Sequence, residues 1–241
     1  MKNLTKVDIQ VIFPQGAHFY QNVNVYLYKS FINFIYKLSC FIVDTKCNDC
    51  SFKEGCQYYH CTGKNFTQYP GIVVNNPIFI KSIYQNEEVL SLNFYFIGNN
   101  DKYIEYIKIF FQSYLNQKIM GNYFYLKDIK ITKVESLASQ MNMFFIDSVI
   151  KTQDFLKEYN QMIKYYNNLY DTSYDDIKNN DVIINRVKKG TLMPIQFKTK
   201  KVIPQGYTYH VMMKEDVTLS SDILLVGVGH YNFIGGGHIE N

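Results

Sequence analysis

The sequence predicts an α+β protein made of two tandem units, each with the element order β-α-β-β-α-β. Three observations support this prediction: apolar residues alternate along several strands, amphipathic helices separate them, and the second half repeats the order of the first. This order defines the ferredoxin-like, or RRM-like, arrangement. We place the first domain at residues 1–133, with a cysteine-containing insertion at about 40–70, and the second at residues 134–241.

The first half supplies the clearer pattern. We expect a strand at 7–13, a break at Pro14–Gly16, a helix at 25–38, strands at 72–83 and 90–96, a helix from Asp101 to Gly121 and a strand at 123–131. Asp101 is expected to be the N-cap of that second helix, because a short polar side chain can accept from free backbone N–H groups. Residues 40–70 show no period, so we expect them to be irregular.

The second half repeats this order less clearly. We expect a strand at 143–150, a helix capped by Asp154, a polar loop at 171–180, extended segments at 181–187, 193–201 and 207–213, turns at 188–190 and 204–206, a short helix at 220–226 and a strand stub at 238–239. The two predicted turns each contain a glycine, which favours hairpins at those positions.

Composition narrows the class of protein. Apolar residues make up 47% of the 241 residues, which is enough for a core and excludes a disordered chain. The net charge of +4 permits an anionic partner without requiring one. Because no apolar run reaches the length of a membrane span and no signal peptide is recognisable, we expect no membrane partner. We therefore expect a cytoplasmic protein whose cysteines stay reduced.

The last fifteen residues carry the most specific pattern of the chain. Gly227, Gly229, Gly235 and Gly237 form a G-x-G-x5-G-x-G motif. Glycine reaches positive φ at little cost, so such pairs let the backbone approach another backbone closely, as gripping a phosphate chain requires. Because the sequence shows no helix after the motif, we do not expect it to be a dinucleotide-binding fingerprint. A nucleic-acid-binding loop and a plain glycine-rich hairpin both remain open.

Two stretches of sequence resemble a known family. KTKKVIPQGYTYHVMMKED followed by SSDILLVGVGHYNFIGGGHIEN resembles the last hairpin, short helix and loop of CRISPR-associated endoribonucleases of the Cas-six family, within the repeat-associated mysterious protein superfamily. EVLSLNFYFIGNNDKYIEYIKIFF resembles the third strand and second helix of that family's first half. The resemblance covers essentially the whole chain and supports the double ferredoxin-like prediction.

The resemblance implies an activity. Such enzymes cleave precursor CRISPR RNA within its repeats to give mature crRNA, without metal, by attack of a 2′-hydroxyl that leaves a 2′,3′-cyclic phosphate. The implied partners are repeat RNA and other subunits of a CRISPR effector complex, and no cofactor is implied for catalysis. Two alternatives stay open: a catalytically inactive crRNA-binding subunit, and a zinc-stabilised module that binds RNA or protein.

The same resemblance suggests which side chains act. His60, followed by Lys64 and Phe66, matches the family's catalytic histidine, lysine and aromatic residue, but His60 can equally belong to the cysteine cluster. His18 lies where other branches place their histidine, and is otherwise a loop residue. Tyr28 matches a tyrosine of some active sites, and is otherwise part of the core or its rim. Histidine suits proton transfer because its pKa lies near neutrality.

Two further sets of residues are candidates for binding. For RNA they are the loop residues Gly227, Gly229, His230, Gly235 and Gly237, and the basic residues Arg186, Lys188, Lys189, Lys198, Lys200 and Lys201, which otherwise form a solvated face. We expect valine at Gly235 or Gly237 to weaken RNA binding and leave the fold largely intact. For structural zinc they are Cys47, Cys50, Cys56 and Cys61, with reduced, metal-free thiols as the alternative and His60 as a replacement for Cys61.

Overall fold

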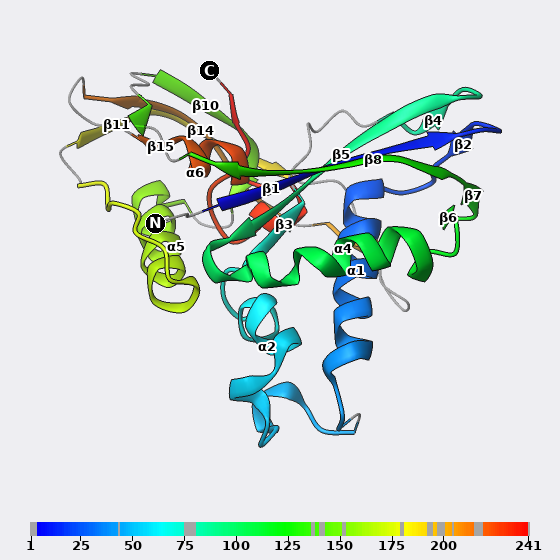
Figure 1. The fold of residues 1–241 in the computed structure, drawn as a ribbon. Coiled ribbons are helices and arrows are strands. Elements are labelled where there is room, and N and C mark those ends of the chain that lie inside the picture. The colour runs from blue at the N-terminus through cyan, green and yellow to red at the C-terminus, as the bar shows by residue number, and fades with distance from the viewer. Residues whose placement is uncertain are drawn as a thin grey trace.

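The computed structural model describes residues 4–42, 44–74, 81–135, 138–139, 143–150, 153–178, 181–191, 195–196, 201–203, 205–214 and 219–240. Within these ranges no helix is both long and apolar enough to cross a membrane. Two four-stranded antiparallel sheets dominate the fold, and helices cover one face of each (Figure 1).

The first sheet has the strand order β3-β5-β1-β8. Its strands are β1 (Leu4–Phe13), β3 (Ile72–Val74), β5 (Glu88–Ile97) and β8 (Tyr125–Val134). Its helices are α1 (Val23–Ser39), between β1 and β3, and α4 (Ile104–Ile109), between β5 and β8. The order second-third-first-fourth, with a helix after the first and third strands, is the predicted ferredoxin-like unit.

The second sheet repeats this order as β11-β14-β10-β16. Its strands are β10 (Met143–Ile150), β11 (Val182–Thr191), β14 (Gln205–Met213) and β16 (Ile239–Glu240). Its helices are α5 (Phe155–Tyr170), after β10, and α6 (Ser221–Val226), after β14. Both halves therefore have the predicted fold, whereas the domain boundary at 133/134 stays a prediction.

The described chain also contains short strands and helices outside the two large sheets. They are β2 (Ala17–His18), β4 (Ile83–Tyr84), β6 (Lys118–Ile119), β7 (Asn122–Tyr123), β9 (Ala138–Ser139), β12 (Ile195–Gln196), β13 (Lys201–Val202), β15 (Leu219–Ser220), α2 (Gln57–Cys61) and α3 (Gly63–Phe66). Helices α2 and α3, with 3₁₀ turns at Cys47–Asp49 and Lys53–Gly55, lie in the segment expected to be irregular. That expectation is wrong for these residues, since each of these helical pieces is too short to show a period.

Sequence periodicity explains the first core. Strand β1 alternates buried and half-buried residues, so one face of its sheet is buried under α1 and α4. Helix α1 starts where the Asn22 side chain accepts hydrogen bonds from the backbone N–H groups of Asn24 and Val25, at 2.9 and 3.2 Å. Its buried face includes Leu27, Phe31 and further apolar residues. The expected helix at 25–38 is thus confirmed.

Two predicted boundaries are wrong. Asp101 does not cap a helix: it lies inside a 3₁₀ turn, Gly98–Tyr103, that precedes α4. Gly121 does not close the helix either, because the helical segment ends in a π-helical turn at Phe110–Tyr114 and Gly121 lies in the β6–β7 hairpin. The 3₁₀ turn begins at Gly98, which has a φ of +53°. The prediction placed the start of the helix three residues later, at Asp101.

The predicted turns at 188–190 and 204–206 are also wrong where the structure describes them. Residues 188–190 continue strand β11, and Gly190 pairs with Gly206 in strand β14. The two glycines sit opposite each other in a ladder, where a long-range pairing overrides the local turn preference of Lys-Lys-Gly. By contrast, Asp154 caps α5 as predicted, because its side chain accepts from Lys157 N at 3.0 Å.

Candidate functional site

The glycine-rich loop between α6 and β16 has the backbone that its sequence predicts. Gly227, Gly229, Gly235 and Gly237 have φ of +77°, +91°, +88° and +64°. The loop folds back on itself, with a hydrogen bond of 2.8 Å from Val228 N to Gly237 O. All four glycines of the motif therefore occupy the region that other residues enter only with strain.

The four glycines are not equivalent in their surroundings. A Cβ on Gly237 would lie 1.7 Å from the carbonyl oxygen of Val228, whereas a Cβ on Gly235 would meet no atom of the described chain within 4 Å. The expectation that valine at either position leaves the fold intact is therefore wrong for Gly237. Gly235 is the position at which a side chain tests the outer side of the loop.

The inner side of the loop is anchored to α5. Asn232 donates from Nδ2 to the hydroxyl of Tyr166 at 2.8 Å, and His230 donates from its backbone N to Oε1 of Glu158 at 2.7 Å. Asn232 and Glu158 are both almost fully buried. Because buried polar groups depend on these partners, the position of the loop is fixed by the second half of the chain.

The loop also contacts the first half, through one aromatic cluster. The ring of Phe233 lies 5.2 Å from that of Tyr28 on α1 and 5.7 Å from that of Phe66 at the end of α3. Tyr28 and Phe66 lie 6.4 Å apart. Three segments that the sequence singled out separately are thus brought together by the fold.

Tyr28 occupies the inside of this cluster. Its side chain is buried, and its hydroxyl has no hydrogen-bond partner among the described residues. Burial raises the pKa of this hydroxyl, and the nearby Cys61 and Tyr58 add to the effect. In this conformation the hydroxyl contacts no solvent, so its catalytic assignment stays a prediction.

Lys64 lies in a strained turn beside the same cluster. Residues Gly63 to Phe66 all have positive φ, at 62°, 55°, 58° and 64°. The turn is held by Thr62, whose hydroxyl accepts from Asn65 N at 3.1 Å and whose carbonyl accepts from Phe66 N at 2.8 Å. Each non-glycine residue in this region costs roughly 1–2 kcal/mol, and such strain tends to persist at functional sites. The backbone of Lys64 is therefore held in one conformation by the turn around it.

His60 lies on α2, against the end of α5. Its ring is edge-on to Tyr170, with centroids 5.4 Å apart, and its Nδ1 is buried without a hydrogen-bond partner among the described residues. Desolvation by burial lowers the pKa of His60, the charge on Lys102 lowers it further, and a contact with the Leu169 carbonyl opposes both. The ring is therefore held in its neutral form near pH 7, which suits a proton acceptor.

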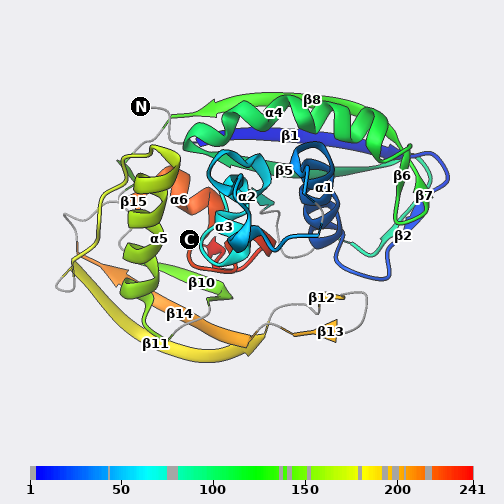
Figure 2. The same ribbon diagram turned by 90° about the horizontal axis from the view of Figure 1, so that it is seen from below.

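His18 lies elsewhere. It is exposed on β2, where its backbone N donates to Oδ1 of Asn122 at 3.1 Å. Figures 1 and 2 both show β2 at the far end of the first sheet from α2. The structure therefore does not bring His18 and His60 into one site, and the two histidines are alternatives.

The basic residues of the second half are described only in part. Lys188 and Lys189 are exposed on β11, and Lys189 lines an open groove with Tyr207 and the adjoining ends of β11 and β14. Lys198 and Lys200 lie outside the described residues, as do the side chains of Arg186 and Lys201. The exposed pair is compatible with an RNA-facing strand, and the whole set stays a prediction.

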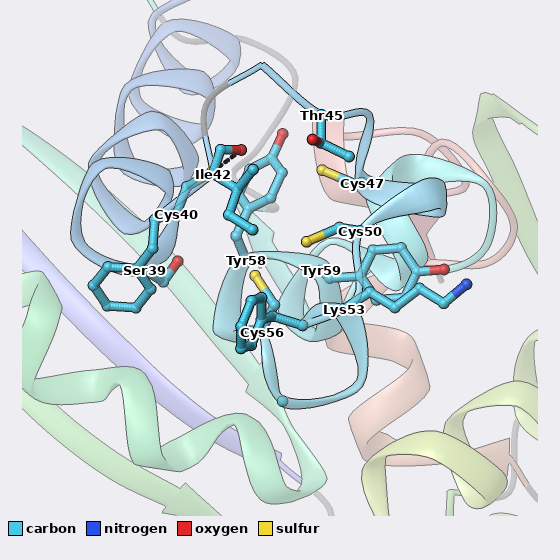
Figure 3. Close-up of a pocket in the computed structure, with 13 residues that line it drawn as sticks. Ser39, Cys40, Ile42, Thr45, Cys47, Cys50, Lys53, Cys56, Tyr58 and Tyr59 are labelled. Atoms are coloured by element: carbon cyan, nitrogen blue, oxygen red, sulfur yellow. Dashed lines mark hydrogen bonds between the residues drawn. The ribbon is translucent and has the colours of Figure 1, made fainter.

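The predicted zinc ligands are divided by the structure. Cys61 is buried in the first core, and its Sγ lies 3.6 Å from the carbonyl oxygen of Tyr58. Cys47, Cys50 and Cys56 instead line a surface hollow (Figure 3). Within the described ranges, no three His, Cys, Asp or Glu side chains are already arranged around one point as metal ligands.

Sequence reasoning missed several residues at this site. Tyr170 places its hydroxyl 2.8 Å from the carbonyl of Tyr69 and 3.2 Å from that of His60, so it links α5 to the insertion. The positive charge of Lys102 lowers the pKa of His60. Two glycines of the first half, Gly71 and Gly98, leave space for Tyr170, because a Cβ on them would lie 2.8 and 1.8 Å from atoms of Tyr170. These glycines are visible in the sequence, but their link to Tyr170 is visible only in the fold.

Comparisons with known proteins agree with this fold. No protein-family model matches the sequence, and no curated protein matches it. Among solved structures, a CRISPR associated protein Cas6 has a TM-score of 0.53 at 12% identity over 99% of both chains. The product of a Cas6-related gene from Pyrococcus furiosus (0.51, 14%) and a RAMP protein binding different RNA substrates (0.50, 15%) each match over 98% of both chains. The chain thus has the double ferredoxin-like fold of these Cas6-related structures.

Proposed function

We propose that this Cas6-like chain binds CRISPR repeat RNA and cleaves it, as an endoribonuclease that matures crRNA. A RAMP protein of the same fold is described as binding different RNA substrates. One observation carries the proposal for this chain: Tyr28, Phe66 and the glycine-rich loop, which are far apart in the sequence, meet at one aromatic cluster. Lys64 lies two residues before Phe66, and His60 lies on the preceding helix.

The proposed chemistry uses a nucleophile that the RNA itself supplies. The 2′-hydroxyl attacks the adjacent phosphorus, the bond to the 5′-oxygen breaks, and a 2′,3′-cyclic phosphate and a 5′-hydroxyl are formed. Because the nucleophile is already in place, the reaction needs no metal-activated water. Its remaining requirements are a proton acceptor, a proton donor for the leaving oxygen and a cation for the added negative charge.

His60 is the proposed proton acceptor. Its lowered pKa keeps the imidazole neutral, so it can take the proton of the 2′-hydroxyl. Lys64, in the strained turn after α2, is the proposed donor of the proton that the leaving 5′-oxygen takes up. Lys102 is the proposed cation, because its charge already lowers the pKa of His60. The ring of His60 packs against α5, so a small opening between α2 and α5 is required before RNA can reach it.

Two other surfaces are proposed to bind the RNA. The outer side of the glycine-rich loop, at Gly235, has room for a close approach of the phosphate backbone. Lys188 and Lys189 on β11 supply positive charge, and lysine–phosphate contacts give most of the affinity in such complexes. These contacts are separate from His60, so binding and cleavage are separable by substitution.

The test is a cleavage assay on the repeat RNA of the host's own CRISPR array, in EDTA. We expect a 5′ product that ends in a cyclic phosphate, and no product when the cut site carries a 2′-deoxy sugar. His60→Ala should slow cleavage by about 100-fold or more with little change in affinity. His18→Ala is the matched control and should cleave as the unmodified chain does. Strict dependence on Mg²⁺, or loss of cleavage in His18→Ala alone, overturns the assignment.

A second function is favoured by one specific observation. The Tyr28 hydroxyl and His60 Nδ1 are both buried without partners among the described residues, so neither atom is presented to a ligand in this conformation. A catalytically inactive subunit that holds crRNA fits this closed arrangement. It is distinguished by tight repeat-RNA binding with no cleavage under any condition.

A further inference from the structure

Four cysteines, one of them outside the set that sequence spacing selects, surround a single hollow in the insertion. Cys40 lines it from the end of α1, and Cys47, Cys50 and Cys56 line it from the two 3₁₀ turns. Figure 3 shows the sulfur atoms of Cys47, Cys50 and Cys56 directed toward the same space. The hollow has a volume of about 190 Å³.

The turns that carry these cysteines have no apolar core of their own. Neither 3₁₀ turn contains a buried residue. Between residues 44 and 56 every side chain is exposed except for Cys47, Cys50, Cys56 and Lys53, which are partly covered. A segment that buries so little apolar surface would gain stability from a bound metal ion, because metal binding free energy contributes to folding. The thiols line the hollow together with aromatic side chains, among them Phe52, Tyr58 and Tyr59.

The backbone of this segment consists of linked turns with a cysteine at most corners. Cys50 N donates to Cys47 O at 3.3 Å, Lys53 N donates to Cys50 O at 3.3 Å, and Cys56 N donates to Lys53 O at 3.1 Å. Lys53 turns its ammonium away, to the carbonyl of Asn48 at 2.8 Å, so it does not neutralise the thiols. Thiolates on tight turns are the usual ligands of structural zinc.

Cys61 is separated from this group. It is fully buried under α1 in the first core, whereas Cys40 is only partly covered. Both thiols lie near a carbonyl oxygen, Cys61 at 3.6 Å from that of Tyr58 and Cys40 at 3.5 Å from that of Ile42, so burial and not this contact separates them. Cys61 does not line the hollow, whereas Cys40 does. The fourth thiol on this side of the insertion is therefore Cys40.

We propose that Cys40, Cys47, Cys50 and Cys56 bind one tetrahedral Zn²⁺ as four thiolates. The four cysteines line the hollow, but their thiols do not converge on one point, and the Cys40 thiol lies 3.5 Å from the carbonyl oxygen of Ile42. Binding therefore requires the thiols to turn toward the ion and the hollow to close around it, at S–Zn distances of about 2.3 Å. Each thiol loses its proton as it binds, and no redox change is involved. The metal ties the end of α1 to the two turns that lead into α2.

The proposed zinc site takes no part in the proposed RNA cleavage, but it is connected to His60 through helix α2. Cys56 is the residue immediately before α2, and His60 lies on that helix. Loss of the metal is therefore expected to loosen the segment that positions His60, while leaving the two sheets folded. A chain that binds zinc and does not cleave RNA would leave this inference intact.

The test compares two single substitutions in the reduced full-length chain. Zn²⁺ content is measured after desalting, and Co²⁺ is titrated as a probe whose intense absorption reports tetrahedral thiolate ligation. We expect one metal per chain, a loss of the four-thiolate spectrum in Cys40→Ser, and its retention in Cys61→Ser. Serine at position 61 can still donate to the Tyr58 carbonyl, which makes it a matched control.

Thiol alkylation with and without metal keeps the inference falsifiable if a variant folds poorly. In the unmodified chain, metal should protect Cys40, Cys47, Cys50 and Cys56, and should not change the reactivity of Cys61. Absence of stoichiometric metal overturns the inference. So does metal-dependent protection of Cys61 in place of Cys40, which would restore the set that the sequence spacing suggests.

Discussion

Substituting alanine at Gly235 and at Gly237 tests how the glycine-rich loop is built. Both residues have positive φ, so alanine at either position costs roughly 1–2 kcal/mol of backbone strain. At Gly235 that is the whole cost, because no described atom lies within 4 Å of the new Cβ. At Gly237 the new Cβ would lie 1.7 Å from the Val228 carbonyl oxygen, so the loop must open.

Opening the loop has a further cost that follows from its hydrogen bonding. It breaks the 2.8 Å hydrogen bond from Val228 N to Gly237 O and leaves a buried donor without a partner, which costs on the order of 1–3 kcal/mol. We therefore expect Gly235→Ala to lower the free energy of unfolding by about 1–2 kcal/mol and Gly237→Ala by about 2–5 kcal/mol. For a chain of this size, each kcal/mol lowers the melting temperature by about 2–4 °C.

The assay is a thermal melt of both variants, followed by repeat-RNA affinity at a temperature where each is folded. Gly237→Ala should melt well below Gly235→Ala. Gly235→Val, whose side chain projects from the outer side of the loop, should weaken RNA binding in a folded protein. Equal melting temperatures for the two alanine variants would refute the steric reasoning, and unchanged affinity in Gly235→Val would show that the loop is only a structural hairpin.

Three further predictions concern single side chains. His60→Gln should remove part of the loss of stability that acid causes. The pKa of His60 in the folded chain lies below its unfolded value of about 6.5, so the unfolded state binds more protons as the pH falls between the two values, and the free energy of unfolding decreases. Denaturant titrations across this pH range measure the difference between the two proteins. Tyr28→Phe should leave the free energy of unfolding unchanged or raise it by up to about 1 kcal/mol, because the buried hydroxyl has no partner among the described residues. A decrease of the free energy of unfolding by more than about 1 kcal/mol, or a loss of cleavage with unchanged RNA affinity, would contradict a purely packing role for this side chain. Asn232→Ala should lower the melting temperature and release the loop, seen as faster hydrogen exchange of its amides, because the 2.8 Å bond to Tyr166 is buried.

Local patterns were sufficient to predict most of the sheet-and-helix order. Strand β10 and helix α5 were predicted because alternation, amphipathic spacing and the Asp154 cap all lie within a few residues of each other. The positive φ of the four motif glycines was likewise a local property. These features need no knowledge of distant contacts, which is why the sequence suffices for them.

Features that depend on distant pairing were not predictable. Residues 188–190 look like a turn until Gly206 is placed opposite Gly190, and only the strand ladder supplies that partner. The role of Cys40 has the same origin: spacing groups Cys61 with Cys47, Cys50 and Cys56, and it is the end of α1 that brings Cys40 to their hollow. Spacing reports neighbours along the chain, whereas a ligand set is decided by neighbours in space.

Phe233 explains how one short motif can both join the halves and serve a ligand. Its ring packs against both hydrophobic cores, against Tyr28 and Phe66 of the first half and alongside the residues that bury α5 in the second. The inner side of the loop is thereby used for packing, whereas a Cβ on Gly235 would meet no atom of the described residues within 4 Å. A ligand that binds there contacts a surface whose shape depends on the docking of both halves. The relative position of the two ferredoxin-like units is therefore expected to influence RNA affinity even when neither His60 nor the lysines of β11 are changed.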